Sequence, residues 1–243
     1  MRMLWLSLII GVFAVTVPTV AAQATTQWTF TQDTRAAAAA FEVEGTTLKV
    51  TLTNTSARAV QSPDDVLTGV YVDLPGVALA PRRVVLGDGS TVLFASSGTG
   101  VDANGELGGE YGYRSDIPGV FTEAAHVLSA VGLGDLVGPP DLFPGDDLVG
   151  PRSPNGIGYG LVSFIDATSN SKVSGAVPLV RNAVVFHLDL PAGHTAPAIR
   201  NVAFNYGSDF NPYPGTNIPA PPTVVTTFMG LAGILAYVRR RTA

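Results

Sequence analysis

The sequence predicts an all-β domain, an antiparallel β-sandwich or jelly roll with one short helix, flanked by a hydrophobic segment at each end. Three observations support this fold class. The 243 residues include 27 glycines and 18 prolines, which is typical of loop-rich β proteins and unfavourable to helical bundles. Several segments alternate apolar and polar residues, the period of a half-buried strand. Only Phe121–Val131 has apolar residues at helical spacing, and Gly132 and Gly134 end that segment.

Residues 1–24 are expected to form a secretory signal peptide. Arg2 opens the chain, Leu4–Val17 is uncharged and mostly apolar, and Pro18 breaks the run. Small residues follow, so cleavage is expected after Ala22 or Ala24. The apolar run is shorter than the roughly 20 residues that span a bilayer, which favours a cleaved signal helix over an uncleaved anchor.

Residues 25–218 are expected to form a single extracytoplasmic domain, because no linker divides them and no repeat recurs. The clearest strands have apolar residues at every second position. They contain Leu48, Val50 and Leu52; Val184, Phe186, Leu188 and Leu190; and Val202, Phe204 and Tyr206. Weaker candidates are Gln27–Thr31, Val66–Asp73, Arg82–Leu86, Thr91–Ala95 and Tyr159–Ile165. Turn residues separate them, as at Glu44-Gly45 and Pro191-Ala192-Gly193.

Residues 219–243 have the features of a C-terminal membrane segment. Pro219-Ala220-Pro221-Pro222 precedes the uncharged run Thr223–Val238, and Arg239, Arg240 and Arg241 follow it. Sixteen residues of helix rise about 24 Å, enough for a short transmembrane helix in a thin bilayer. The arginines are expected to keep that end in the cytoplasm, so the body would lie outside.

The order of Pro-x-Pro, short apolar helix and arginine cluster resembles the sorting tail of the PEP-CTERM class of bacterial surface proteins. The resemblance implies that an exosortase, a membrane transpeptidase-like enzyme, processes the motif Pro219, Ala220 and Pro221. Ala220 replaces the usual central glutamate, which leaves open which sorting enzyme acts. A plain C-terminal anchor is the alternative.

Four body segments resemble exosortase-dependent surface proteins of the XDD subgroup. They are Tyr111–Asp116, Gly132–Leu136, Gly158–Ser163 and Val202–Asp209. Proteins of that subgroup are secreted and have no assigned catalytic activity. The resemblance therefore implies a location rather than a chemistry.

Composition and charge exclude several classes. The absence of cysteine excludes disulfide scaffolds, thiolate zinc sites, iron–sulfur clusters and cysteine nucleophiles. The body has 19 acidic residues and ten of the 14 basic ones, since Arg2 and Arg239–Arg241 lie in the ends, and its net charge is −9. Such a surface repels phosphates, so no nucleic-acid partner is expected.

No catalytic motif stands out in the body. There is no Gly-x-Ser-x-Gly elbow, and the three histidines stand in ordinary contexts. One hypothesis is that His187, Asp189 and His194 bind zinc. A solvated polar strand face explains the presence of His187 and Asp189 better. Glycoside hydrolysis needs two carboxylates, and any acidic β-sandwich would supply candidates such as Glu42, Glu106, Glu110 and Glu123. We therefore expect no enzyme.

Two ligand-binding hypotheses remain. The first is calcium binding, for which there are two weak candidates. Asp102, Asn104 and Glu106 place three oxygen groups at positions i, i+2 and i+4, and Asp146 and Asp147 lie close together in another loop. Asx-turns explain both segments equally well. A sugar-binding face could use the flat rings of Tyr111, Tyr113, Tyr159, Tyr206, Phe210 and Tyr213, although Tyr206 is expected to pack inside.

The sequence thus favours a non-enzymatic bacterial surface or extracellular-matrix protein without a cofactor. It would be exported, transiently anchored in the inner membrane with its C-terminus in the cytoplasm, and processed by an exosortase-type enzyme. The alternative is a surface carbohydrate-binding module, calcium-dependent in one form, whose partner would be an extracellular polysaccharide.

Overall fold

The computed structural model describes residues 25–93, 104–121, 125–138, 140–148, 156–166, 177–194 and 198–219, together with Pro154 and Val173. The expected signal peptide and residues 220–243 lie outside the described residues, so the predictions for these two helices stay predictions. Within the described ranges no helix is long and apolar enough to cross a membrane.

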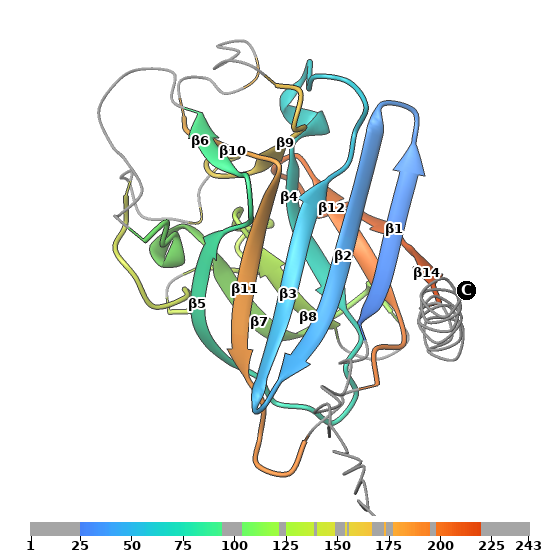
Figure 1. The fold of residues 1–243 in the computed structure, drawn as a ribbon, viewed down its shortest axis with the longest axis vertical. Coiled ribbons are helices and arrows are strands. Elements are labelled where there is room, and N and C mark those ends of the chain that lie inside the picture. Colours follow the sequence, from blue (N-terminus) through green and yellow to red (C-terminus); the bar gives the residue numbers. More distant parts are fainter. Residues whose placement is uncertain are drawn as a thin grey trace, which may run out of the picture.

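The first sheet has six strands in the order β14-β1-β2-β3-β11-β5, all paired antiparallel (Figure 1). Its strands are β1 (Thr26–Gln32), β2 (Arg35–Glu44), β3 (Thr47–Asn54), β5 (Ala80–Leu86), β11 (Ala183–Asp189) and β14 (Thr216–Ile218). Two-residue turns join β1 to β2 and β2 to β3, because Gln32 pairs with Arg35 and Glu44 with Thr47. The second turn is the predicted Glu44-Gly45 turn, and Gly45 has a positive φ of 61° there.

The second sheet has the order β13-β12-β4-β9-β10-β6, and β8 joins it by pairing with β4 and β7. Its strands are β4 (Leu67–Val72), β6 (Thr91–Leu93), β7 (Gly112–Ile117), β8 (Ala125–Ser129), β9 (Leu161–Val162), β10 (Leu179–Arg181), β12 (Val202–Tyr206) and β13 (Pro212–Pro214). The pairing of β9 with β10 is parallel, which departs from the predicted antiparallel pattern. Two short 3-10 helices, η1 (Pro63–Asp65) and η2 (Gly108–Glu110), lie in the connections.

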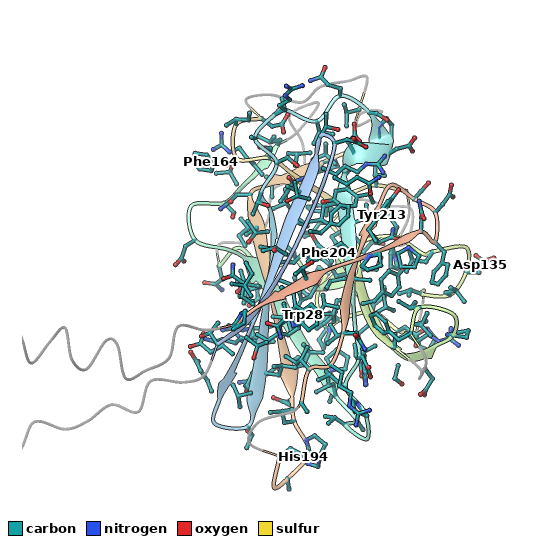
Figure 2. All side chains as sticks on the ribbon, turned by 90° about the vertical axis from the view of Figure 1, so that its right-hand side faces the viewer. Trp28, Asp135, Phe164, His194, Phe204 and Tyr213 are labelled. Carbon is teal, nitrogen blue, oxygen red and sulfur yellow. The ribbon has the colours of Figure 1, made fainter. Side chains whose placement is uncertain are left out.

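Side chains from both sheets meet in one apolar core. Phe41, Val50 and Phe186 enter it from the first sheet, Val70 and Phe204 enter it from the second, and each is at most 2% exposed. Figure 2 shows Trp28 and Phe204 in the interior of the sandwich, while Phe164 and His194 lie at its periphery. The described part of the chain is therefore all-β, as predicted.

The strong strand predictions are confirmed as β3, β11 and β12, and the weaker ones as β1, β4, β5, β6 and a shorter β9. The predicted helix over Phe121–Val131 is wrong. Ala125–Ser129 is strand β8, which pairs with β4 on one side and β7 on the other. All five residues are buried, because a second apolar cluster covers the outer face of this sheet. A strand buried on both faces loses its alternation, so short apolar runs imitate a helix.

Candidate functional site

A polar pocket lies at the end of the sandwich where the β1–β2 turn and η1 lie (Figure 1). Its volume is about 210 Å³. It is lined by Arg35, Asp64, Tyr206, Gly207, Ser208, Asp209, Asn211 and Tyr213. Arg35 begins β2 in the first sheet, whereas most of the other residues belong to β12, β13 and the loop between them in the second sheet. The pocket therefore forms only when the two sheets pack together.

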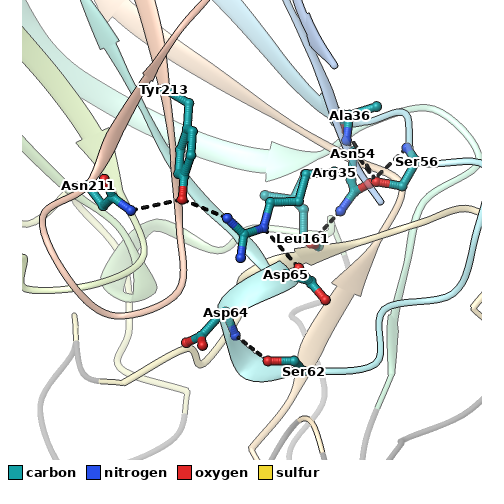
Figure 3. A network of polar contacts seen from close by, with 10 residues as sticks. All are labelled: Arg35, Ala36, Asn54, Ser56, Ser62, Asp64, Asp65, Leu161, Asn211 and Tyr213. Atoms are coloured by element: carbon teal, nitrogen blue, oxygen red, sulfur yellow. Dashed lines mark hydrogen bonds and ion pairs between the residues drawn. The ribbon is translucent and has the colours of Figure 1, made fainter. Parts of the chain in front are cut away.

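Arg35 is the fixed centre of this pocket (Figure 3). Its Nε donates a hydrogen bond of 2.9 Å to Asp65 Oδ1, and its Nη1 donates one of 2.6 Å to the Tyr213 hydroxyl. The guanidinium carbon lies 5.6 Å from the ring centre of Tyr206 and 5.4 Å from that of Tyr213, within cation–π range. Partial burial opposes the charge, but Asp65 and Tyr213 favour it, and the net effect raises the pKa of Arg35. The side chain is 24% exposed, so a charged donor reaches the pocket.

The acidic side of the pocket is set by a helix cap. Ser62 is the N-cap of η1, and its Oγ accepts a hydrogen bond of 3.1 Å from the Asp64 N–H. Pro63 follows with a fixed φ, which favours the turn. The two carboxylates of Asp64 and Asp65 are thereby held on one short helix beside Arg35 (Figure 3).

Hydrogen bonds beneath the pocket connect the two sheets. The Ala36 N–H donates to Ser56 Oγ, and the Ser56 N–H donates to Asn54 Oδ1, each at 3.0 Å. The Asn54 amide then donates across the sandwich to the carbonyl of Leu161 in β9, also at 3.0 Å. This chain fixes the start of β2, and with it Arg35, relative to the second sheet.

The loop after β12 forms the opposite wall. Gly207 turns the chain with a positive φ of 73°, and Thr68 Oγ1 donates a hydrogen bond of 2.7 Å to its carbonyl. The buried Asn205 side chain donates to Thr68 Oγ1 and accepts from the N–H of Asn211, both at 3.0 Å. The Asn211 amide donates to the Tyr213 hydroxyl at 2.8 Å. The wall is therefore rigidly connected to a buried polar network.

The Tyr206 hydroxyl has no hydrogen-bond partner among the described residues. Tyr206 lines the pocket but is only 4% exposed. Burial raises the pKa of this hydroxyl, so it stays protonated and can donate. Buried polar groups are nearly always paired, so an orphan on a residue that lines a cavity indicates a partner other than the described residues.

The pocket has mixed hydrogen-bonding chemistry. It offers a guanidinium, carboxylates, an amide and hydroxyls, which can both donate and accept hydrogen bonds.

The described calcium candidates belong to no metal-binding cluster of described residues. Asp102 lies outside the described residues, Asn104 is exposed in a turn, and Asp146 and Asp147 are exposed in another loop. Glu106 forms an ion pair of 3.6 Å with Arg83. In the described ranges no three His, Asp or Glu side chains gather in a way that would hold a metal ion. A calcium site in these segments stays a prediction.

The sorting residues lie at the boundary of the described chain. Pro219 is exposed and follows directly after β14, whereas Ala220, Pro221 and Arg239–Arg241 lie outside the described residues.

Most of the proposed sugar-stacking aromatics are unavailable to a ligand. Tyr111, Tyr113 and Tyr159 are buried, so they pack inside the domain and offer no flat outer face to a sugar. The Tyr111 hydroxyl donates to the Tyr159 carbonyl at 2.5 Å, which is a structural role. Tyr206 is inside, as predicted, while Phe210 is exposed and Tyr213 is half-buried.

The zinc hypothesis is not favoured by the charges around His187. This histidine is 7% exposed on β11, so the expected solvated face is wrong at its position. Lys49 on β3 and Arg83 on β5 are its direct cross-strand partners. Burial, followed by Arg83, Lys49 and Arg82, lowers its pKa, and these cations also oppose a metal ion. Asp189 lies 3.8 Å from Arg82, and His194 is exposed in a turn.

A second hollow of about 360 Å³ contains His126, but this histidine is already engaged. Its Nε2 lies 3.2 Å from the Leu74 carbonyl, and its Nδ1 lies 2.9 Å from the Tyr113 hydroxyl. A carbonyl only accepts, so Nε2 carries the hydrogen and Nδ1 accepts from Tyr113. Neither nitrogen is left to act as a base.

The stability of the fold is expected to fall as the pH drops below 6.5. Burial lowers the pKa of His126 from 6.5, against smaller opposite effects of the Leu74 carbonyl, Asp116 and Asp73. Between the lowered pKa and 6.5, the unfolded chain binds a proton that the folded chain does not, so acid favours unfolding. His187 adds to the same slope.

Urea unfolding midpoints measured on both sides of pH 6.5 check this prediction. His126→Gln should flatten the slope. An unchanged slope in His126→Gln would contradict it.

The comparisons with known proteins add no assignment to this geometry. No protein-family model, no curated protein and no solved structure matches the chain.

Proposed function

We propose that the chain is a non-enzymatic, exported bacterial surface protein that is sorted through its C-terminal segment. The observation that carries the proposal is the order of Pro219-Ala220-Pro221, the apolar run Thr223–Val238 and the cluster Arg239–Arg241. A short apolar helix followed by positive charge stops translocation with the charge in the cytoplasm. An exosortase-type enzyme then processes the chain near the proline motif, and the β-domain becomes part of the cell surface or matrix.

The edge of the first sheet supports this proposal. Strand β14 pairs with β1, with Gln27 opposite Ile218 and Thr29 opposite Thr216. The domain therefore begins and ends on two neighbouring strands, and its last paired residue precedes Pro219 directly. Proline cannot donate a ladder hydrogen bond, so the strand is expected to end there and to leave an extended junction for a processing enzyme.

Intact-mass analysis of the protein from its native cells tests the proposal, with envelope and medium analysed separately. The expected result is loss of both ends, with a new C-terminus between Pro219 and Pro222. A membrane-bound protein with an intact C-terminus would instead identify an ordinary tail anchor.

Replacing Arg239, Arg240 and Arg241 together by alanine is expected to missort the protein. Without these charges the tail loses the feature that holds it on the cytoplasmic side. Cell fractionation measures the effect, and Arg58→Ala, a change at an exposed arginine of the domain, is the control. Unchanged fractionation of the triple variant would contradict the proposed topology.

A second function, surface carbohydrate binding, is favoured by the polar pocket around Arg35. Its mixed donors and acceptors and its half-buried Tyr213 suit a hydroxylated ligand. Calcium dependence is not part of this second proposal, because the pocket itself supplies its polar groups.

A further inference from the structure

We propose that the pocket around Arg35 binds a single ring of a neutral saccharide. The proposal rests on the second proposed function, surface carbohydrate binding, and names the class of ligand. It is independent of sorting, because sorting concerns how the domain reaches the surface, while this site concerns what the domain binds there.

The charges of the pocket disfavour an anionic ligand. Arg35 is paired with Asp65 at 2.9 Å, and Asp64 and Asp209 add two further carboxylates to the lining. An anionic ligand would therefore meet a net negative pocket. A neutral ligand avoids this repulsion.

The hydrogen-bonding groups match hydroxyls, which both donate and accept. Of the five N–H groups of Arg35, one is used by Asp65 and one by Tyr213, so others remain to donate to a ligand oxygen. Asp64 and Asp209 can accept from ligand hydroxyls, and Ser208 can do either. Adjacent hydroxyls on one ring satisfy such a mixed set, whereas an apolar ligand would leave it unpaired.

The Tyr206 hydroxyl is the independent observation that indicates a ligand. It is buried, protonated, unpartnered in the described part of the chain and carried by a residue that lines the pocket. A ligand hydroxyl within reach of it would supply the missing acceptor. Among the described lining residues, no other has a polar atom that is both buried and unpartnered.

The size of the pocket limits the ligand to one ring. At about 210 Å³ the pocket is smaller than the roughly 300–1,000 Å³ of pockets for drug-sized ligands, so it suits a small ligand such as one sugar ring. A monosaccharide replaces several ordered waters with its own hydroxyls. The half-buried Tyr213 ring and the exposed Phe210 in the same loop offer aromatic surface at the rim.

Binding is tested on the full chain, kept in a detergent without a sugar headgroup. The probes are glucose, galactose and mannose, each compared with its uronic acid by titration calorimetry or saturation-transfer NMR. We expect at least one neutral sugar to bind and its uronic acid to bind at least about ten-fold more weakly.

Variants assign that binding to the pocket. Asp209→Ala and Asn211→Ala should each weaken it about ten-fold, because hydrogen bonds to charged or oriented groups are lost. Asp88→Ala, which removes an exposed carboxylate from the β5–β6 turn outside the lining, should leave it unchanged. Asn211→Ala also removes the hydrogen bond to Tyr213, so Asp209→Ala provides the test if that variant is unstable.

Three results would overturn the site. They are no binding of any neutral sugar, equal binding of its uronic acid, or equal losses in Asp209→Ala and Asp88→Ala. These results leave the sorting proposal untouched, because that proposal is judged by cell fractionation and mass. Conversely, a missorted variant that still binds sugar would show that sugar binding does not depend on sorting.

Discussion

Replacing Phe186 by alanine is expected to lower the free energy of unfolding by about 3–5 kcal/mol. Phe186 is fully buried on β11, a strand that pairs with β3 on one side and β5 on the other. Its ring packs edge-on against Tyr111, with ring centres 5.3 Å apart, and at a tilt against Phe143 at 5.7 Å. Truncation leaves a cavity that paired strands cannot close, so both the burial and the ring contacts are lost.

Urea denaturation followed through the fluorescence of the buried Trp28 measures this loss. The matched control is Phe164→Ala, because Phe164 is 61% exposed and its ring centre lies 5.8 Å from the guanidinium carbon of Arg181. Removing that exposed contact is expected to change the free energy of unfolding by no more than about 1 kcal/mol. Similar losses in the two variants would contradict the position of Phe186 in the core.

The strands that could be predicted are those in which one face meets the core and the other does not. In β3, Leu48, Val50 and Leu52 enter the core, while Lys49 lies outside with Glu44 at 2.6 Å. The alternation of apolar and polar residues is therefore visible in the local sequence. It recurs in β11 and β12, which is why these three strands are the clearest predictions.

Strand β2 could not be recognised in this way. Its five consecutive alanines carry no alternation, and alanine is the best helix former. The segment becomes a strand because β1 and β3 pair with it on both sides. Tertiary pairing of this kind overrides local propensity, and it depends on residues that the local pattern does not include.

The pocket was beyond prediction for a related reason. Arg35 and Tyr213 are 178 residues apart, and Arg35 and Asp65 are 30 apart, so no motif spacing joins them. The quoted segment Val202–Asp209 does supply part of the wall, but the resemblance implied only a location for the protein. The residues of the pocket come together only when the two sheets pack, so no local sequence pattern contains them.

Replacing Asn205 by alanine is expected to cost about 3 kcal/mol of unfolding free energy. Asn205 is fully buried, and its Oδ1 accepts from both the Tyr71 hydroxyl at 3.1 Å and the Asn211 N–H at 3.0 Å. The alanine leaves both donors without this partner, and it removes the hydrogen bond to Thr68. Buried polar groups that lose a partner cost more than the bond itself contributed. Urea unfolding measures the loss, and Asn217→Ala on the exposed strand β14 is the matched amide control.

A double-mutant cycle with Tyr71→Phe separates the pair from its neighbours. Tyr71→Phe alone removes one hydroxyl and leaves Asn205 with its remaining partners, so its cost should be about 1 kcal/mol. In the double variant the orphaned hydroxyl is gone, so the total should be smaller than the sum of the two single losses. Additive losses would mean that the tyrosine and the asparagine act independently. A sub-additive result would show that the two side chains act together. If sugar binding is also weakened in Asn205→Ala but retained in Tyr71→Phe, the hydrogen bond between Asn205 and the Asn211 backbone is the contact that supports the pocket wall.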